Sequence, residues 1–157
     1  MEIEKKYLVK KLPEHLEQYS YYKIEQGYLC TEPVVRIRRQ DDTYILTYKS
    51  KGLMAREEYN LPLTKEAYFH LKPKADGIII EKTRYKIPFQ KYTIELDVFE
   101  KDLAPLVLAE VEFESVAEAE RFVPPEWFGD NVSDDHRYSN SYLSTCKDLS
   151  AFSIGKC

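Results

Sequence analysis

The chain has 157 residues, of which 43% are hydrophobic and 13% are aromatic, with only five glycines. This composition excludes a disordered or linker-like chain and fits a β-rich globular protein with a sizeable core. A formal net charge of -4 argues against a broad nucleic-acid-binding surface, because such a surface requires an excess of positive charge.

The first residues are charged where a secretory signal would need an apolar run. No stretch approaches the roughly 20 apolar residues of a membrane helix. Neither an internal repeat nor a low-complexity linker interrupts the sequence. We therefore expect a soluble, cytoplasmic protein that has no membrane partner and forms a single domain over residues 1–157.

The first half of the chain predicts an antiparallel meander. Alternating charged and apolar residues predict a strand at 2–9, and Pro13 opens a short helical segment at 14–19. Aromatic and β-branched residues, separated by turn residues, then predict four strands, at 21–30, 34–40, 43–51 and 54–61.

Helices and strands alternate in the second half. A helix is expected at 64–72, where Thr64 would provide the N-cap. A second helix is expected at 115–123, where Ser115 and Glu118 fit a capping box, before Pro124 and Pro125 end it. The remaining elements are a last helix at 138–147 and three strands, at 78–87, 91–99 and 106–114. This gives about eight strands and three or four helices.

The second to sixth residues would place three charged side chains on one face of a strand. Glu2, Glu4 and Lys6 alternate with Ile3 and Lys5, so two carboxylates and an ammonium group point the same way. Other predicted strands are also sorted by the sign of their charge. Acidic alternates lie at Glu95, Asp97, Glu110 and Glu112, and basic alternates lie at Arg36, Arg38, Lys82 and Arg84.

Two interpretations of this alternation are open. An antiparallel sheet commonly has one packed face and one wet face, and the charged residues would then be in solvent. Alternatively, the charged faces line a ligand-binding lumen. Carboxylate pairs favour hard divalent cations, and arginine pairs favour phosphate, because their planar donors match its oxygens.

The segment Glu2-Ile3-Glu4-Lys5-Lys6 resembles the ExExK signature of the CYTH superfamily, the triphosphate tunnel metalloenzymes. Further segments similar to the family follow in its order, at residues 25–29, 35–38, 46–49, 81–85, 94–97, 109–113 and 137–140. The resemblance covers nearly the whole chain. It implies an α+β fold, in which an eight-stranded antiparallel β-barrel encloses a charged lumen and helices pack outside.

The resemblance also implies hydrolysis of a triphosphate, either inorganic tripolyphosphate or a nucleoside triphosphate, with one or two Mg²⁺ or Mn²⁺ ions. The implied metal ligands are Glu2, Glu4, Glu95, Asp97, Glu110 and Glu112. The implied phosphate-binding residues are Lys6, Arg36, Arg38, Lys49, Arg56, Lys82, Arg84 and Arg137. The resemblance to some relatives also implies a tyrosine activated by a lysine, and here Tyr28 and Lys82 are the catalytic candidates, with Tyr28 as proton acceptor for water.

Three other functions are compatible with the same residues. A class IV-type adenylyl cyclase would make cyclic AMP and pyrophosphate, with the ribose hydroxyl as nucleophile. An RNA 5′-triphosphatase would admit only the triphosphate end of an RNA. A noncatalytic polyphosphate binder would bind without turnover. The triphosphatase is preferred, because the chain is short and has no recognisable base-binding insertion.

Overall fold

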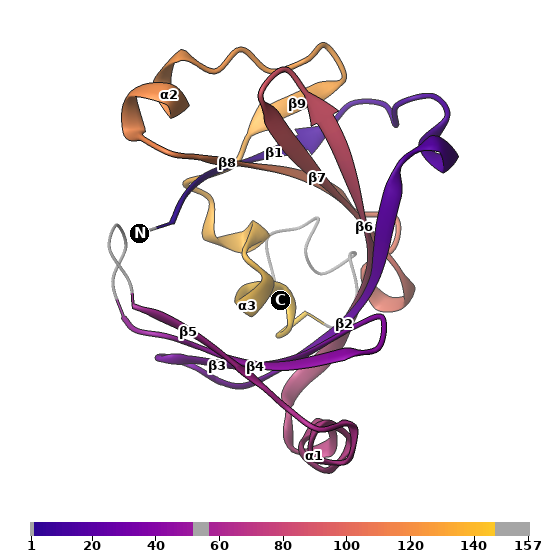
Figure 1. Ribbon diagram of the computed structural model, residues 1–157, viewed down its shortest axis with the longest axis vertical. Coiled ribbons are helices and arrows are strands. Elements are labelled where there is room, and N and C mark those ends of the chain that lie inside the picture. The colour runs from indigo at the N-terminus through magenta and orange to yellow at the C-terminus, as the bar shows by residue number, and fades with distance from the viewer. Residues whose placement is uncertain (1, 52–56, 147–157) are drawn as a thin grey trace.

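The computed structural model describes residues 2–51 and 57–146, and these residues form one antiparallel sheet of nine strands that curls around an interior (Figure 1). The spatial order of the strands is β5-β4-β3-β2-β6-β7-β8-β1-β9. Their bounds are β1 (Ile3–Val9), β2 (Ser20–Thr31), β3 (Val34–Gln40), β4 (Thr43–Lys49), β5 (Glu58–Pro62), β6 (Asp76–Phe89), β7 (Tyr92–Phe99), β8 (Val107–Phe113) and β9 (Phe128–Asn131).

The helices are short and lie between or after strands. The α-helices are α1 (Lys65–Leu71), α2 (Val116–Arg121) and α3 (Asn140–Leu143). The 3-10 turns are η1 (Leu16–Gln18), η2 (Lys72–Lys74), η3 (Lys101–Leu103) and η4 (His136–Tyr138). The Thr64 hydroxyl accepts a hydrogen bond from Ala67 N–H, and the Ser115 hydroxyl accepts one from Glu118 N–H, which confirms both predicted N-caps.

The predicted fold class is confirmed, with two differences in the strands. The sheet has nine strands rather than eight, because the short β9 pairs with β1. This strand contains Gly129 and Asp130 and lacks the alternation on which strand prediction depends. Within the described residues, β5 and β9 form the two edges and do not pair, so backbone hydrogen bonds do not close the ring.

Apolar alternates face outward and are covered by helices and loops. On one side, Leu96, Val111 and Phe113 belong to a cluster with Ala119 of α2 and Phe128 of β9. On the opposite side, Ile37 packs with Tyr44 and with Tyr68 of α1. The outer position of α1 and α2 is as expected (Figure 1).

The last helix corrects the expectation that all helices pack outside, because α3 lies within the ring of strands (Figure 1). Its Leu143 is fully buried against interior-facing residues such as Tyr28, Ile80 and Leu108. Gly77 permits this packing, since it has a φ of 66° and an added Cβ would lie 2.0 Å from the Ser144 carbonyl oxygen. An apolar plug therefore fills one end of the interior.

The described residues contain no helix with the length and apolar character needed to cross a membrane.

Candidate active site

A polar cavity of about 230 Å³ occupies the part of the interior that the apolar plug leaves open. Its charged side chains come from strand positions that alternate with the outward apolar residues. The acidic lining residues are Glu2, Glu4, Glu58, Glu95, Glu110 and Glu112, and the basic ones are Lys6, Arg36, Arg38, Lys49 and Arg84. The charged faces thus line a cavity, as the lumen interpretation expected, while Glu2, Glu4, Glu58 and Glu112 are also exposed to solvent.

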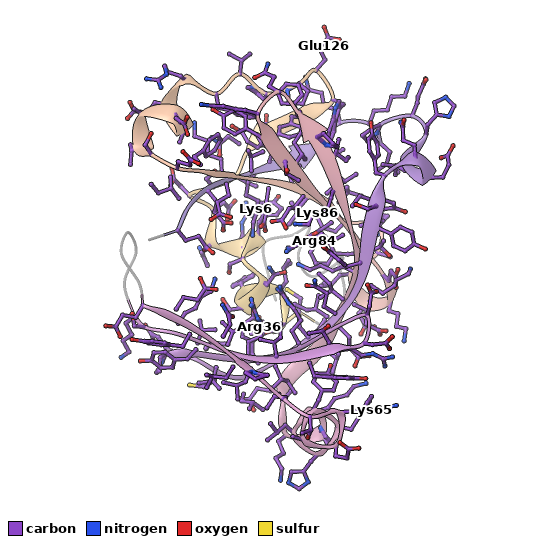
Figure 2. All side chains as sticks on the ribbon, in the orientation of Figure 1. Lys6, Arg36, Lys65, Arg84, Lys86 and Glu126 are labelled. Atoms are coloured by element: carbon purple, nitrogen blue, oxygen red, sulfur yellow. The ribbon has the colours of Figure 1, made fainter. Side chains whose placement is uncertain are left out.

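The charges of the cavity are separated between two walls. Glu4 is opposite Glu112 in the register of β1 and β8, and Glu95 is opposite Glu110 in that of β7 and β8. The wall formed by β2, β3 and β4 carries Arg36 and Arg38 instead. Figure 2 shows Lys6 and Arg84 on one side of the interior and Arg36 on the other, whereas Lys65 and Glu126 lie on the outer surface.

The cations on the acidic side are already paired. Lys6 Nζ lies 3.3 Å from Glu110 Oε1 and donates to the Tyr138 carbonyl oxygen. Arg84 donates to both carboxylate oxygens of Asp97, at 2.8 and 2.9 Å. These contacts neutralise much of the positive charge on this side before a ligand arrives.

The arginines of the opposite wall have only neutral partners. Arg38 Nε donates to Gln26 Oε1 at 2.7 Å, and Arg36 Nη2 donates to Thr47 Oγ1 at 3.3 Å. Within the described residues, neither guanidinium lies within 4.0 Å of a carboxylate. Burial, followed by the like charges of Arg36 and Arg84, lowers the pKa of Arg38 to about 9. Arg38 therefore stays cationic at neutral pH, and an anion in the cavity would stabilise it.

The acidic wall carries negative charges that lack a counter-ion in the described structure. Desolvation, followed by the like charges of Glu110 and Glu2, raises the pKa of Glu4 to about 7. Glu4 and Glu112 make no ion pair within the described residues. Like charges placed opposite each other on neighbouring strands repel, so a cation between them would stabilise this wall.

The carboxylates of this wall match the chemistry of a hard divalent cation. No three histidine, cysteine, aspartate or glutamate side chains of the described chain converge into a complete metal cage. Mg²⁺ does not require such a cage, because it usually keeps several waters and takes one or two carboxylates together with substrate phosphate oxygens. Glu4 and Glu112 fit this partial donor set.

Asp97 is placed differently from the other predicted metal ligands. It is fully buried outside the cavity lining, where Lys82 Nζ donates to its Oδ2 at 2.7 Å and Arg84 occupies both oxygens. Burial alone would raise the pKa of Asp97, but Arg84 and then Lys82 outweigh it and hold the pKa well below its usual range. Asp97 thus pairs with two buried basic side chains, Lys82 and Arg84, while burial still lowers the pKa of Lys82 to about 7.

Four other predicted residues need separate comment. Tyr28 lines the inner part of the cavity, but Lys82 Nζ donates to Asp97 and Asn140 in the described structure, with no hydrogen bond to Tyr28. Arg137 pairs with Asp135 in η4 and is not part of the cavity lining. Arg56 lies outside the described residues.

Several lining residues were absent from the predicted set: Glu58, Ser139, Asn140 and Ser141. Glu58 is opposite Lys49 in the register of β4 and β5, which sequence alone does not provide. Ser139 and Asn140 do belong to the carboxy-terminal segment that resembles the family. Their polar character and this resemblance could have identified them as lining residues from the sequence.

The pKa of Glu4 gives a testable dependence of stability on pH. Its folded-state pKa of about 7 lies above the ordinary value of 4.5, so ionised Glu4 destabilises the fold. This penalty is complete above about pH 7 and absent below about pH 4.5. In chelator, the wild-type free energy of unfolding should therefore rise between about pH 8 and pH 5, relative to that of Glu4→Gln. Urea unfolding of both proteins measures the difference, and parallel curves would contradict this assignment.

Comparison with known proteins agrees with this geometry. A model of the CYTH domain family matches residues 1–142. The chain is 40% identical over 148 residues to a protein of Nitrosomonas europaea named inorganic triphosphatase, with 91% of this chain and 96% of that protein aligned. A second inorganic triphosphatase, from Acetivibrio thermocellus, is 37% identical over 148 residues, covering 90% of this chain and 92% of the relative.

Solved structures give the same result. The crystal structure of an inorganic triphosphatase superposes with a TM-score of 0.75 at 37% identity, covering 94% of this chain and 97% of the other. A Hippeastrum protein described as a putative adenylyl cyclase with dominant triphosphatase activity has a TM-score of 0.61 at 14% identity, over 100% and 97% of the two chains. At that identity the similarity shows the fold alone. The family model and the two curated relatives span most of the sequence, and the chain belongs to the CYTH domain family.

Proposed function

We propose that this protein is a metal-dependent inorganic triphosphatase, which hydrolyses tripolyphosphate to pyrophosphate and orthophosphate. The observation that carries this function is the separation of charge in the cavity. Among the described residues, Arg36 and Arg38 make no ion pair with an acid on one wall, and Glu4 and Glu112 make none with a base on the other. A triphosphate accompanied by a divalent cation supplies both missing charges.

An inorganic substrate fits the lining better than a nucleotide. The only lining residues with substantial apolar surface in the described cavity are Val34 and Tyr28, and Tyr28 is 3% exposed. A nucleobase usually needs an aromatic or apolar surface for stacking, which this cavity offers only to a small extent. The two relatives named inorganic triphosphatases support the same choice.

The residues divide the work of phosphoryl transfer between them. Arg36 and Arg38 would bind the phosphate oxygens and hold the triphosphate in line with the attacking water. Such positioning is most of what this reaction needs from a protein. Glu4 and Glu112 would hold the cation, with Glu2 and Glu110 beside them. When bound, Mg²⁺ or Mn²⁺ would neutralise phosphate charge and lower the pKa of the attacking water.

Product analysis with tripolyphosphate and ATP, supplied separately with Mg²⁺, Mn²⁺ or chelator, tests this function. We expect equal amounts of orthophosphate and pyrophosphate from tripolyphosphate, faster turnover than with ATP, and no turnover in chelator. Cyclic AMP with pyrophosphate from ATP would instead identify a cyclase. Faster release of orthophosphate from a 5′-triphosphorylated RNA would identify an RNA triphosphatase, and tight binding without turnover would identify a binder.

Tyr28 is proposed to accept the proton of the attacking water. It lines the cavity beside Arg36, its partner in the register of β2 and β3. Replacing Tyr28 with phenylalanine removes only the hydroxyl group, so we expect kcat to fall by about 10²-fold while KM changes little. Steady-state kinetics on tripolyphosphate measure this change. An unchanged kcat would show that Tyr28 does not accept the proton, and that activation of the attacking water by the metal is sufficient.

We also infer that residues 1–157 form a single cytoplasmic domain that acts on a small-molecule triphosphate. Support comes from the continuous sheet that runs from β5 to β9 and from α3, which fills the end of the same interior.

A further inference from the structure

Gln26 is an unusual residue for the interior of this protein. It lies on β2 opposite Arg38 of β3, and its side chain is fully buried. Its Oε1 accepts the hydrogen bond from Arg38 Nε at 2.7 Å, but its Nε2 has no hydrogen-bond partner in the described structure. A buried donor without a partner costs about 1–3 kcal/mol, so stability alone does not explain an amide at this position.

A glutamate at this position would serve stability better. It has nearly the same shape as glutamine, would leave no amide donor unpaired and would place a negative charge against the Arg38 guanidinium. The other side of the cavity uses such pairs, since Arg84 is held by Asp97 and Lys6 by Glu110. The neutral acceptor at Gln26 is therefore a departure from the pattern of the site.

The consequence of a neutral acceptor is that Arg38 is oriented without being neutralised. A guanidinium has five N–H donors, and the described contacts of Arg38 use only the one on Nε. Both terminal nitrogens remain available for phosphate oxygens. Thr47 is likewise a neutral partner of Arg36, because its hydroxyl accepts a hydrogen bond from Arg36 Nη2 without adding a negative charge.

We propose that Gln26 is a positioning residue for the triphosphate, which fixes Arg38 through Nε and preserves the full positive charge of its guanidinium for the substrate. This role rests on the proposed triphosphatase function. Gln26 is not part of the cavity lining and acts on the substrate only through Arg38. Gln26 would strengthen phosphate binding in two ways: it orients Arg38, and it adds no negative charge beside Arg38. A different substitution of Gln26 removes each of these properties.

Gln26→Glu adds a negative charge beside Arg38 and keeps the oxygen that accepts the hydrogen bond from Arg38 Nε. We expect its melting temperature to equal or exceed that of the wild type, because Arg38 gains an ionic partner. We expect KM for tripolyphosphate to rise at least tenfold, because the same carboxylate neutralises the arginine that binds phosphate. A merely structural role predicts equal or higher stability with unchanged KM, so the two roles give different results.

Gln26→Met removes the acceptor and keeps the approximate volume. We expect KM to rise several-fold, since Arg38 loses its orientation, without the gain in melting temperature expected for Gln26→Glu. Gln18→Glu is the matched control, because it makes the same change of charge at an exposed position in η1, outside the cavity lining. Its KM should equal that of the wild type.

Binding of tripolyphosphate is also measured by calorimetry in chelator, where turnover does not interfere. Weaker binding by Gln26→Glu and Gln26→Met than by Gln18→Glu supports the positioning role, even if the wild type proves not to hydrolyse tripolyphosphate. Wild-type affinity and KM in a folded Gln26→Glu protein would overturn it. If Gln26→Glu does not fold, unchanged affinity in Gln26→Met overturns it, and a wild type that neither binds nor hydrolyses tripolyphosphate overturns both this role and the proposed function.

Discussion

Arg38→Ala is expected to lower kcat/KM for tripolyphosphate by about 10²–10³-fold, the range observed when one preorganised donor to a developing anion is removed. Arg38 is a partly buried cation that no carboxylate of the described structure approaches within 4.0 Å, so its charge is available to the phosphate. Its removal also relieves repulsion from Arg36 and Arg84, and the protein should remain folded.

Arg39→Ala is the matched control, because Arg39 precedes the turn on the same strand and faces outward. Its guanidinium lies 5.9 Å from the ring centres of both Tyr44 and Phe69, outside the cavity. Wild-type turnover is expected for this variant. Arg38→Lys separates charge from geometry, since it keeps the positive charge but loses the planar pair of donors. Turnover within twofold of the wild type in a folded Arg38→Ala protein would exclude Arg38 from the site.

Asp97→Asn is expected to destabilise the protein by roughly 3–5 kcal/mol, the usual effect of removing one partner of a buried ion pair. The asparagine keeps the shape of the side chain but leaves Lys82 and Arg84 buried without their main counter-charge. This loss is large compared with the roughly 5–15 kcal/mol stability of a typical domain. The midpoint of urea unfolding at pH 7 measures it.

Glu17→Gln makes the same chemical change on the surface. Within the described part of the chain Glu17 pairs only with His15, and both side chains are largely exposed, so the unfolding midpoint should stay close to that of the wild type. A similar midpoint for Asp97→Asn and Glu17→Gln would show that Asp97 is not a structural counter-ion. In that case its predicted role as a metal ligand would regain support.

Prediction from sequence succeeded where the strand period of two residues applies. Glu95 and Glu110 were placed on the charged face by alternation, and both line the cavity. The N-caps at Thr64 and Ser115 were also predicted, because capping depends on residues three positions apart. Local rules suffice for features of this kind.

Prediction was incomplete where a feature depends on contacts between distant segments. The strand β9 has no pattern of its own and exists because it pairs with β1, more than 115 residues earlier in the chain. The helix α3 is only four residues long, and its place inside the ring follows from the packing of Leu143 with residues of distant strands, such as Ile80 and Leu108. Asp97 and Glu95 lie two residues apart on β7 and therefore share one face of the strand, yet of these two only Glu95 lines the cavity.

The sequence by itself determined the fold class, the alternation of charged and apolar faces and most of the charged side chains that line the cavity. These features follow from local periodicity and from the resemblance of successive segments to one family. The tertiary structure decided which charges pair and which remain available. Pairing depends on the register of strands far apart in the chain, and this register gives Arg84 a carboxylate and gives Arg38 the uncharged amide of Gln26.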